Sequence, residues 1–95
     1  MSIIAIAKVK AEDGKSLEVL TLIKGSQEKA LNSGVCEKFD ILQSTNDPHS
    51  FSLLEIWPSI ENHKKFLENL MSDSEFIEAM ACIQDGPHIE YFNLK

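Results

Sequence analysis

The sequence contains few cysteines and no pair of histidines at metal-ligand spacing. Its two cysteines, Cys36 and Cys82, are too few for a disulfide framework, and they stand in none of the Cys-x-x-Cys or Cys/His spacings that are typical of metal sites. We therefore expect two reduced thiols that pack as small apolar groups. A metal site would have to be assembled from distant segments of the chain, so none is predicted.

Basic residues are also scarce. Lysine and arginine together number nine against fifteen acidic residues, which gives a formal net charge of −6. Because the basic residues do not gather into a patch, we expect no binding to nucleic acid or to an anionic membrane surface. The N-terminal stretch SIIAIAKVK is too short to span a membrane, and it lacks the basic start and the cleavage site of a signal peptide. A soluble, cytoplasmic protein is expected.

The periodicity of apolar residues predicts one domain over residues 1–95, in which strands and helices alternate. Strands are expected at 2–10, 35–45, 50–57 and 88–95, and helices at 16–33, at 59–71 and from 72 onward, with a turn at 84–87. Gly34 ends the first helix and Ser59 caps the second. In the third, the spacing of Ser72 and Glu75 is that of a capping box, and its inward residues are expected to be Phe76, Ile77 and Met80. The order β-α-β-β-α-β predicts a ferredoxin-like α+β fold with an antiparallel sheet.

Three of the expected strands carry apolar residues on both faces. In the first strand, for example, Ile3 and Ala5 face one way and Ile4 and Ile6 the other. A chain of 95 residues has helices enough to cover one face only. We therefore expect the uncovered face to pack against a second copy in a homodimer.

The junction between the third strand and the second helix, FSLLEIWPSIENH, concentrates polar and aromatic groups. Glu55 and Trp57 share a face of the strand, and His63 lies within the apolar arc of the helix that follows. His63 is therefore expected to point into the core. Gly25, inside the first helix, marks either a close approach of another group or a tolerated surface glycine.

Several residues together resemble a known family. They are Gly34, Phe39-Asp40, Glu55-x-Trp57, the helical His63 and Gly86-Pro87 before the last strand. This pattern is similar to that of the antibiotic biosynthesis monooxygenase family, and within it to the quinol monooxygenases and to the isomerase of the phosphorylated autoinducer-2 signal. The resemblance implies a dimeric α+β barrel with a cavity in each subunit. In several members it implies oxidation of aromatic polyketides or quinols by dioxygen without a metal or flavin cofactor. The haem-degrading branch uses an asparagine on the first strand, which SIIAIAKVK does not contain.

The resemblance also suggests roles for individual residues. His63 is the candidate catalytic base, because an imidazole that titrates near neutrality can ionise a substrate before it meets dioxygen. Trp57 and Phe39 are candidates to stack on an aromatic substrate, Tyr91 to donate to a developing oxyanion, and Glu55 to contact the substrate as a general acid.

Structural readings of the same residues remain open. His63 can equally be a core histidine that is satisfied by one backbone carbonyl. For Glu55, an ion pair with Lys8 or Lys38 across the sheet is the favoured interpretation. At the level of function, a small enzyme, either an oxygenase or an isomerase, stands against a non-catalytic dimer that binds a small hydrophobic molecule.

Overall fold

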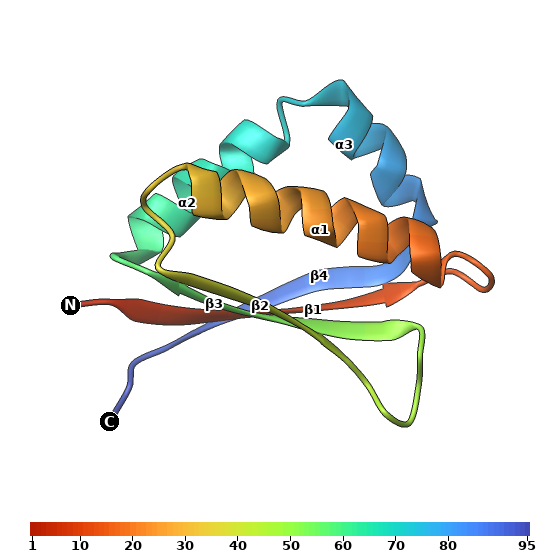
Figure 1. The fold of residues 1–95 in the computed structure, drawn as a ribbon, viewed down its shortest axis with the longest axis horizontal. Coiled ribbons are helices and arrows are strands. Elements are labelled where there is room, and N and C mark those ends of the chain that lie inside the picture. Colours follow the sequence, from red (N-terminus) through yellow and green to blue (C-terminus); the bar gives the residue numbers. More distant parts are fainter.

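The computed structural model describes all 95 residues. Figure 1 shows a four-stranded sheet with its α-helices on one side. The elements follow one another as β1 (Ile3–Ala11), α1 (Ser16–Asn32), β2 (Lys38–Gln43), β3 (Ser50–Trp57), α2 (Ile60–Leu70), α3 (Ser74–Ala79), the 3₁₀ turn η1 (Met80–Cys82) and β4 (Ile83–Phe92). The strand order is β2-β3-β1-β4, and each neighbouring pair is antiparallel. The predicted ferredoxin-like α+β fold is confirmed.

Helix α1 packs along the sheet through a stripe at helical spacing. Val19, Ile23, Ser26 and Ala30 are its buried residues. Gly34 follows the helix with φ of 76°, a left-handed conformation that glycine adopts without steric cost. Gly25 lies on the exposed side, where an added Cβ would meet no atom within 4 Å. No other segment of this chain therefore approaches Gly25 closely.

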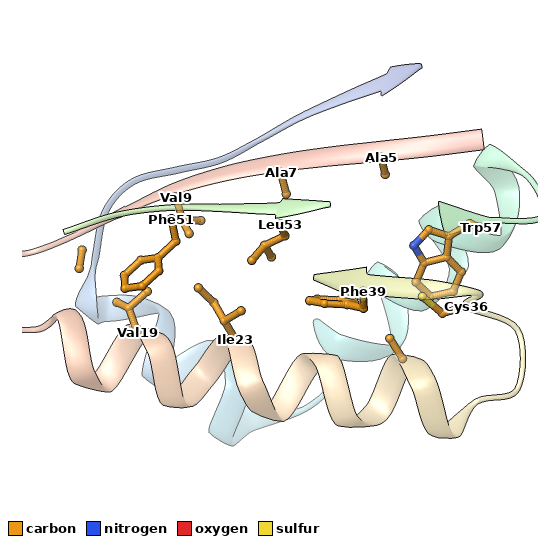
Figure 2. Packing of buried hydrophobic residues seen from close by; sticks show 12 residues of the cluster. Ala5, Ala7, Val9, Val19, Ile23, Cys36, Phe39, Phe51, Leu53 and Trp57 are labelled. Carbon is orange, nitrogen blue, oxygen red and sulfur yellow. The ribbon is translucent and has the colours of Figure 1, made fainter. Parts of the chain in front are cut away.

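The core lies between α1 and the sheet, as Figure 2 shows for the buried apolar side chains. Strand β3 alternates strictly, with Phe51, Leu53, Glu55 and Trp57 buried and the intervening residues partly exposed. In β1 the helix-facing residues are small: Ala5, Ala7 and Ala11 are buried there together with Val9. Small side chains on β1 leave room above the middle of the sheet.

Two of the expected strands, those at 35–45 and 88–95, differ from the observed bounds by more than one residue. Strand β2 runs from Lys38 to Gln43 rather than over 35–45, because the preceding residues connect α1 to the sheet. The turn expected at 84–87 is wrong: β4 begins at Ile83, continues through Gly86 and Pro87, and ends at Phe92. As an edge strand, β4 tolerates a proline, and its register against β1 shifts between Lys8 and Lys10. At Gly86, φ is 101°, and a Cβ there would collide with the carbonyl oxygen of Lys8.

The short helix α3 forms where it was expected, but its cap differs. Asp73, not Ser72, is the N-cap, and its carboxylate accepts a hydrogen bond from the backbone N–H of Glu75 at 3.0 Å. Phe76 and Met80 turn inward, whereas Ile77 is 47% exposed, so its predicted burial is wrong. No helix has both the length and the apolar character needed to cross a membrane.

The face of the sheet opposite the helices is bare in the monomer, and it is the lower face in Figure 1. Lysines occupy it toward the ends of the strands, and apolar side chains occupy its centre. The apolar residues that point to this face by strand alternation are Ile4, Ile6, Leu42, Leu54, Ile56 and Phe92.

Candidate active site

One row of side chains crosses all four strands on the helix-facing side of the sheet. The register pairs Phe39 of β2 with Glu55 of β3, Glu55 with Ala5 of β1, and Ala5 with Tyr91 of β4. Neighbouring strands are about 4.8 Å apart, so Glu55 and Tyr91 stand roughly 10 Å apart with only a methyl group between them. The row therefore contains a gap over Ala5.

The first turn of α2 places an imidazole over this gap. Ser59 caps the helix by accepting a hydrogen bond from the backbone N–H of Asn62 at 3.1 Å, which directs the next residue, His63, toward the sheet. His63 is 1% exposed, as its position in the apolar arc predicted. Its Nδ1 lies 2.8 Å from the hydroxyl oxygen of Tyr91, and its Nε2 lies 3.5 Å from Oε1 of Glu55. Both ring nitrogens thus face side chains, not a backbone carbonyl.

Glu55 is buried in the core, and its carboxylate forms no ion pair with a lysine. It is 3% exposed, and its Oε1 accepts a hydrogen bond from the indole N–H of Trp57 at 2.9 Å. The ion pair expected with Lys8 or Lys38 is wrong, because strand alternation places both lysines on the opposite face. Lys38 instead lies 3.4 Å from Asp40.

The pKa values of two groups near Glu55, the hydroxyl of Tyr91 and the thiol of Cys36, are both raised. Burial, with the negative charge of Glu55 as the second cause, raises the pKa of the Tyr91 hydroxyl. Burial also raises the pKa of the Cys36 thiol, again with Glu55 contributing. Both groups therefore keep their hydrogens at neutral pH.

A cavity of about 100 Å³ lies between the sheet and the helices, next to Glu55 and His63. Fourteen of its eighteen lining residues are hydrophobic, and they come from the sheet, α1, α2, α3 and η1. The other four are Ser26, Glu55, His63 and Pro87. Since the hydroxyl of Ser26 donates to the carbonyl of Leu22, the ionisable groups facing this apolar space are one carboxylate and one imidazole.

Comparison with known proteins places the chain in a family. The model of the antibiotic biosynthesis monooxygenase family matches residues 2–83. The chain belongs to this family. No curated protein sequence matches it.

Solved structures share the fold of this antibiotic biosynthesis monooxygenase family member at low sequence identity. A conserved protein of Methanosarcina mazei is 20% identical with a TM-score of 0.80, over 100% of this chain and 94% of that one. An antibiotic biosynthesis monooxygenase is 18% identical with a TM-score of 0.75, over 98% of both chains. A Pseudomonas aeruginosa protein is 17% identical with a TM-score of 0.75, over 99% of this chain and 95% of that one. At these identities the likeness is one of fold.

In this family member the five residues singled out from the sequence lie close together. Three of them line the cavity, and two lie behind it. His63, Glu55 and Phe39 line the cavity. Trp57 and Tyr91 are not among the lining residues and lie behind Glu55 and His63, to which they are hydrogen-bonded. Trp57 also packs against His63 and Phe66, with ring centroids 5.4 and 5.0 Å away.

Sequence reasoning did not single out several residues that shape the space. Ala5 makes room for the imidazole, and the cavity is also lined by Leu70, Met71 and Ile89, together with Met80, whose inward position was predicted. The alternation of isoleucine and alanine at the start of β1 was the available signal for Ala5, since an alanine pair among larger residues indicates room above the sheet. The structure contains no cluster of three or more His, Cys, Asp or Glu side chains that could hold a metal ion.

Proposed function

We propose that the protein is a cofactor-independent monooxygenase that oxidises a single-ring quinol or phenol with dioxygen. The observation that supports this proposal is the carboxylate–imidazole pair of Glu55 and His63, which opens onto an apolar cavity. Such a pair can accept a proton from a bound hydroxyl group while the remaining walls exclude water.

Removal of the proton makes the substrate electron-rich, and the resulting anion can reduce dioxygen itself. For a 1,4-hydroquinone the balanced reaction consumes one quinol and one dioxygen and yields one hydroxyquinone and one water. The substrate supplies four electrons, and one oxygen atom remains on the ring. The part of the protein is to ionise the quinol, to orient it and to keep it dry.

The size of the cavity limits the substrate. Its volume of about 100 Å³ is smaller than the cavity of ~150 Å³ that admits a benzene ring. A single ring therefore fits after small movements of the methionines on its wall, Met71 and Met80, whose side chains adapt readily. Fused-ring polyketides would require the helices to separate. Phe39, on the sheet side, is positioned to contact a flat ring.

The pair of Glu55 and His63 could also serve the isomerisation of a phosphorylated sugar, but the cavity favours this function less. No lysine lines the cavity, and the chain contains no arginine. A phosphate group would therefore face the carboxylate of Glu55 without a compensating cation.

Oxygen uptake tests the activity directly. The wild-type protein is incubated with methyl-substituted hydroquinones and with an anthrone in an oxygen electrode, alongside His63→Ala and Glu55→Gln. Each variant is expected to lose at least 100-fold in rate, the usual contribution of a positioned acid or base. His88→Ala is the matched control, because that histidine is exposed and pairs with Asp85 at 2.7 Å. If a quinol binds without oxygen uptake in the wild type, the protein is a binding protein rather than an oxygenase.

We also propose that the protein acts as a homodimer in the cytoplasm. The bare sheet face carries apolar side chains at its centre, and burying them against a second copy is favoured by about 25 cal/mol per Å². Its two cysteines are free thiols, which suits a reducing compartment.

A further inference from the structure

We propose that the carboxylate of Glu55, rather than the imidazole of His63, takes the proton from the substrate, and that His63 donates a hydrogen bond to the anion that forms. This inference rests on the proposed oxygenase function and assigns roles within its site. It follows from the hydrogen-bond partners of three side chains.

Nδ1 of His63 faces Tyr91. The tyrosine hydroxyl, 2.8 Å away, is the hydrogen-bond partner of Nδ1. Because burial and the nearby charge of Glu55 raise the pKa of Tyr91, the hydroxyl keeps its hydrogen and can donate it. A neutral imidazole that accepts at Nδ1 carries its own hydrogen on Nε2.

Nε2, on the other side of the ring, faces Glu55. Nε2 lies 3.5 Å from Oε1, the oxygen that already accepts the indole N–H of Trp57. The indole N–H of Trp57 therefore leaves Oε1 as an acceptor on the side of Glu55 that faces Nε2. Beside a carboxylate, an N–H on Nε2 is attracted and a bare lone pair is repelled. Glu55 therefore favours the tautomer with the hydrogen on Nε2, and Tyr91, which can donate to Nδ1, is compatible with it.

The second oxygen of Glu55, Oε2, is the free acceptor at the cavity. With its hydrogen on Nε2, His63 presents no lone pair to the cavity. No group of the protein donates a hydrogen bond to Oε2 of Glu55. Every fully buried side-chain oxygen in the structure has a hydrogen-bond partner, so Oε2 is not fully buried. Because Glu55 lines the cavity, Oε2 is accessible from there. The proton of a bound phenol O–H moves to Oε2 and leaves a carboxylic acid and a phenolate, whose oxygen accepts from Nε2–H.

The tautomer is measured without a substrate. Protein labelled with ¹⁵N at histidine is examined by long-range ¹H–¹⁵N correlation at neutral pH, with His63→Asn used to assign the signals. In the neutral form of the ring we expect the hydrogen on Nε2 and none on Nδ1. We expect Tyr91→Phe to shift His63 toward a mixture of tautomers. A neutral ring that carries its hydrogen on Nδ1 overturns the assignment.

The identity of the base is tested under nitrogen. Without dioxygen, the measurement reports proton transfer alone and does not depend on oxygenase activity. A monochlorophenol is bound to the wild type, Glu55→Gln and His63→Asn, and the absorption band of its anion is followed. We expect the bound anion in the wild type, at least 100-fold less of it in Glu55→Gln, and about tenfold less in His63→Asn, which keeps an N–H donor. The reverse order of the two variants, or a neutral phenol in the wild type, overturns the inference. Absence of oxygen uptake with normal ionisation would instead refute the oxygenase function alone.

Discussion

At the scale of single residues, the indole N–H of Trp57 is the hydrogen-bond donor to a carboxylate that the fold has removed from water. Glu55 is 3% exposed and Trp57 is 1% exposed. Hydrogen bonds to charged groups contribute about 1.5–3 kcal/mol, and removing one partner leaves the other buried without compensation. The bond therefore has consequences for stability as well as for the site.

Trp57→Phe is expected to lower the free energy of unfolding by about 2–4 kcal/mol, because it removes this donor and part of a fully buried ring. Urea unfolding followed by circular dichroism measures the change. In a Glu55→Gln background the uncharged amide depends less on the indole, so the cost of Trp57→Phe should fall by about 1 kcal/mol or more. Equal costs in the two backgrounds would show that the hydrogen bond contributes nothing.

How far the sequence could predict the site is clear from these same residues. Periodicity alone indicated that His63 points inward and that Glu55 and Trp57 share a face. It could not indicate that Glu55 would meet His63 rather than Lys38, because that depends on the register of three strands. The pairing of Tyr91 with His63 likewise requires Ala5 to stand between β3 and β4, which only the assembled sheet reveals.

At the scale of elements, the glycines of α1 and β4 have opposite roles. Gly25 sits in the interior of α1 with open space where a Cβ would be. Gly25→Ala is expected to raise the free energy of unfolding by about 0.5–1 kcal/mol, through the better helix propensity of alanine. Chemical denaturation measures the gain. If the variant is less stable than the wild type, α1 must meet another chain or segment at this position.

Gly86→Ala is the matched substitution in a strand and should be destabilising. The added methyl group would meet the Lys8 carbonyl oxygen, and φ of 101° is strained for alanine. The same position explains why a turn was wrongly predicted there. Asp85-Gly86-Pro87 has local turn character, but pairing with β1 overrides it, and the glycine serves a close approach between the two strands.

The loop between β2 and β3 is expected to make stability depend on acid. Asp47 accepts hydrogen bonds from the backbone N–H of His49 and the hydroxyl of Ser50, and Lys10 lies 3.5 Å away. Led by the His49 bond, these contacts lower the pKa of Asp47 from 3.8 to about 2. A lowered folded-state pKa stabilises the protein above about pH 4 and loses its effect as the pH falls toward 2.

Asp47→Asn should therefore lower the thermal midpoint at neutral pH and flatten its dependence between pH 4 and pH 2. Thermal unfolding followed by circular dichroism across this range measures both effects. Asp13→Asn is the control, since that carboxylate is exposed in the turn between β1 and α1. Parallel acid profiles for Asp47→Asn and the wild type would contradict the assignment of the loop as the acid-sensitive element.

At the scale of the whole molecule, the helices cover one side of a sheet that is apolar on both. The row Asp40, Leu54, Ile6, Glu90 crosses the bare face, and its centre is aliphatic while its ends are charged. This is the arrangement of an interface with an apolar core and a polar rim. It does not depend on the cavity, which lies on the other side of the sheet.

Leu54→Lys, at the centre of the bare face, is expected to convert the protein from a dimer to a monomer, because an ammonium group at the apolar centre of the interface would lose its hydration on burial. Sedimentation equilibrium should then give the chain mass of 10.7 kDa for the variant and about twice that for the wild type. Leu17→Lys is the matched control, since Leu17 is 71% exposed on α1, away from the bare face. A wild type that sediments as a 10.7 kDa species at micromolar concentration would contradict the dimer, and it would leave the apolar centre of the sheet to a different partner.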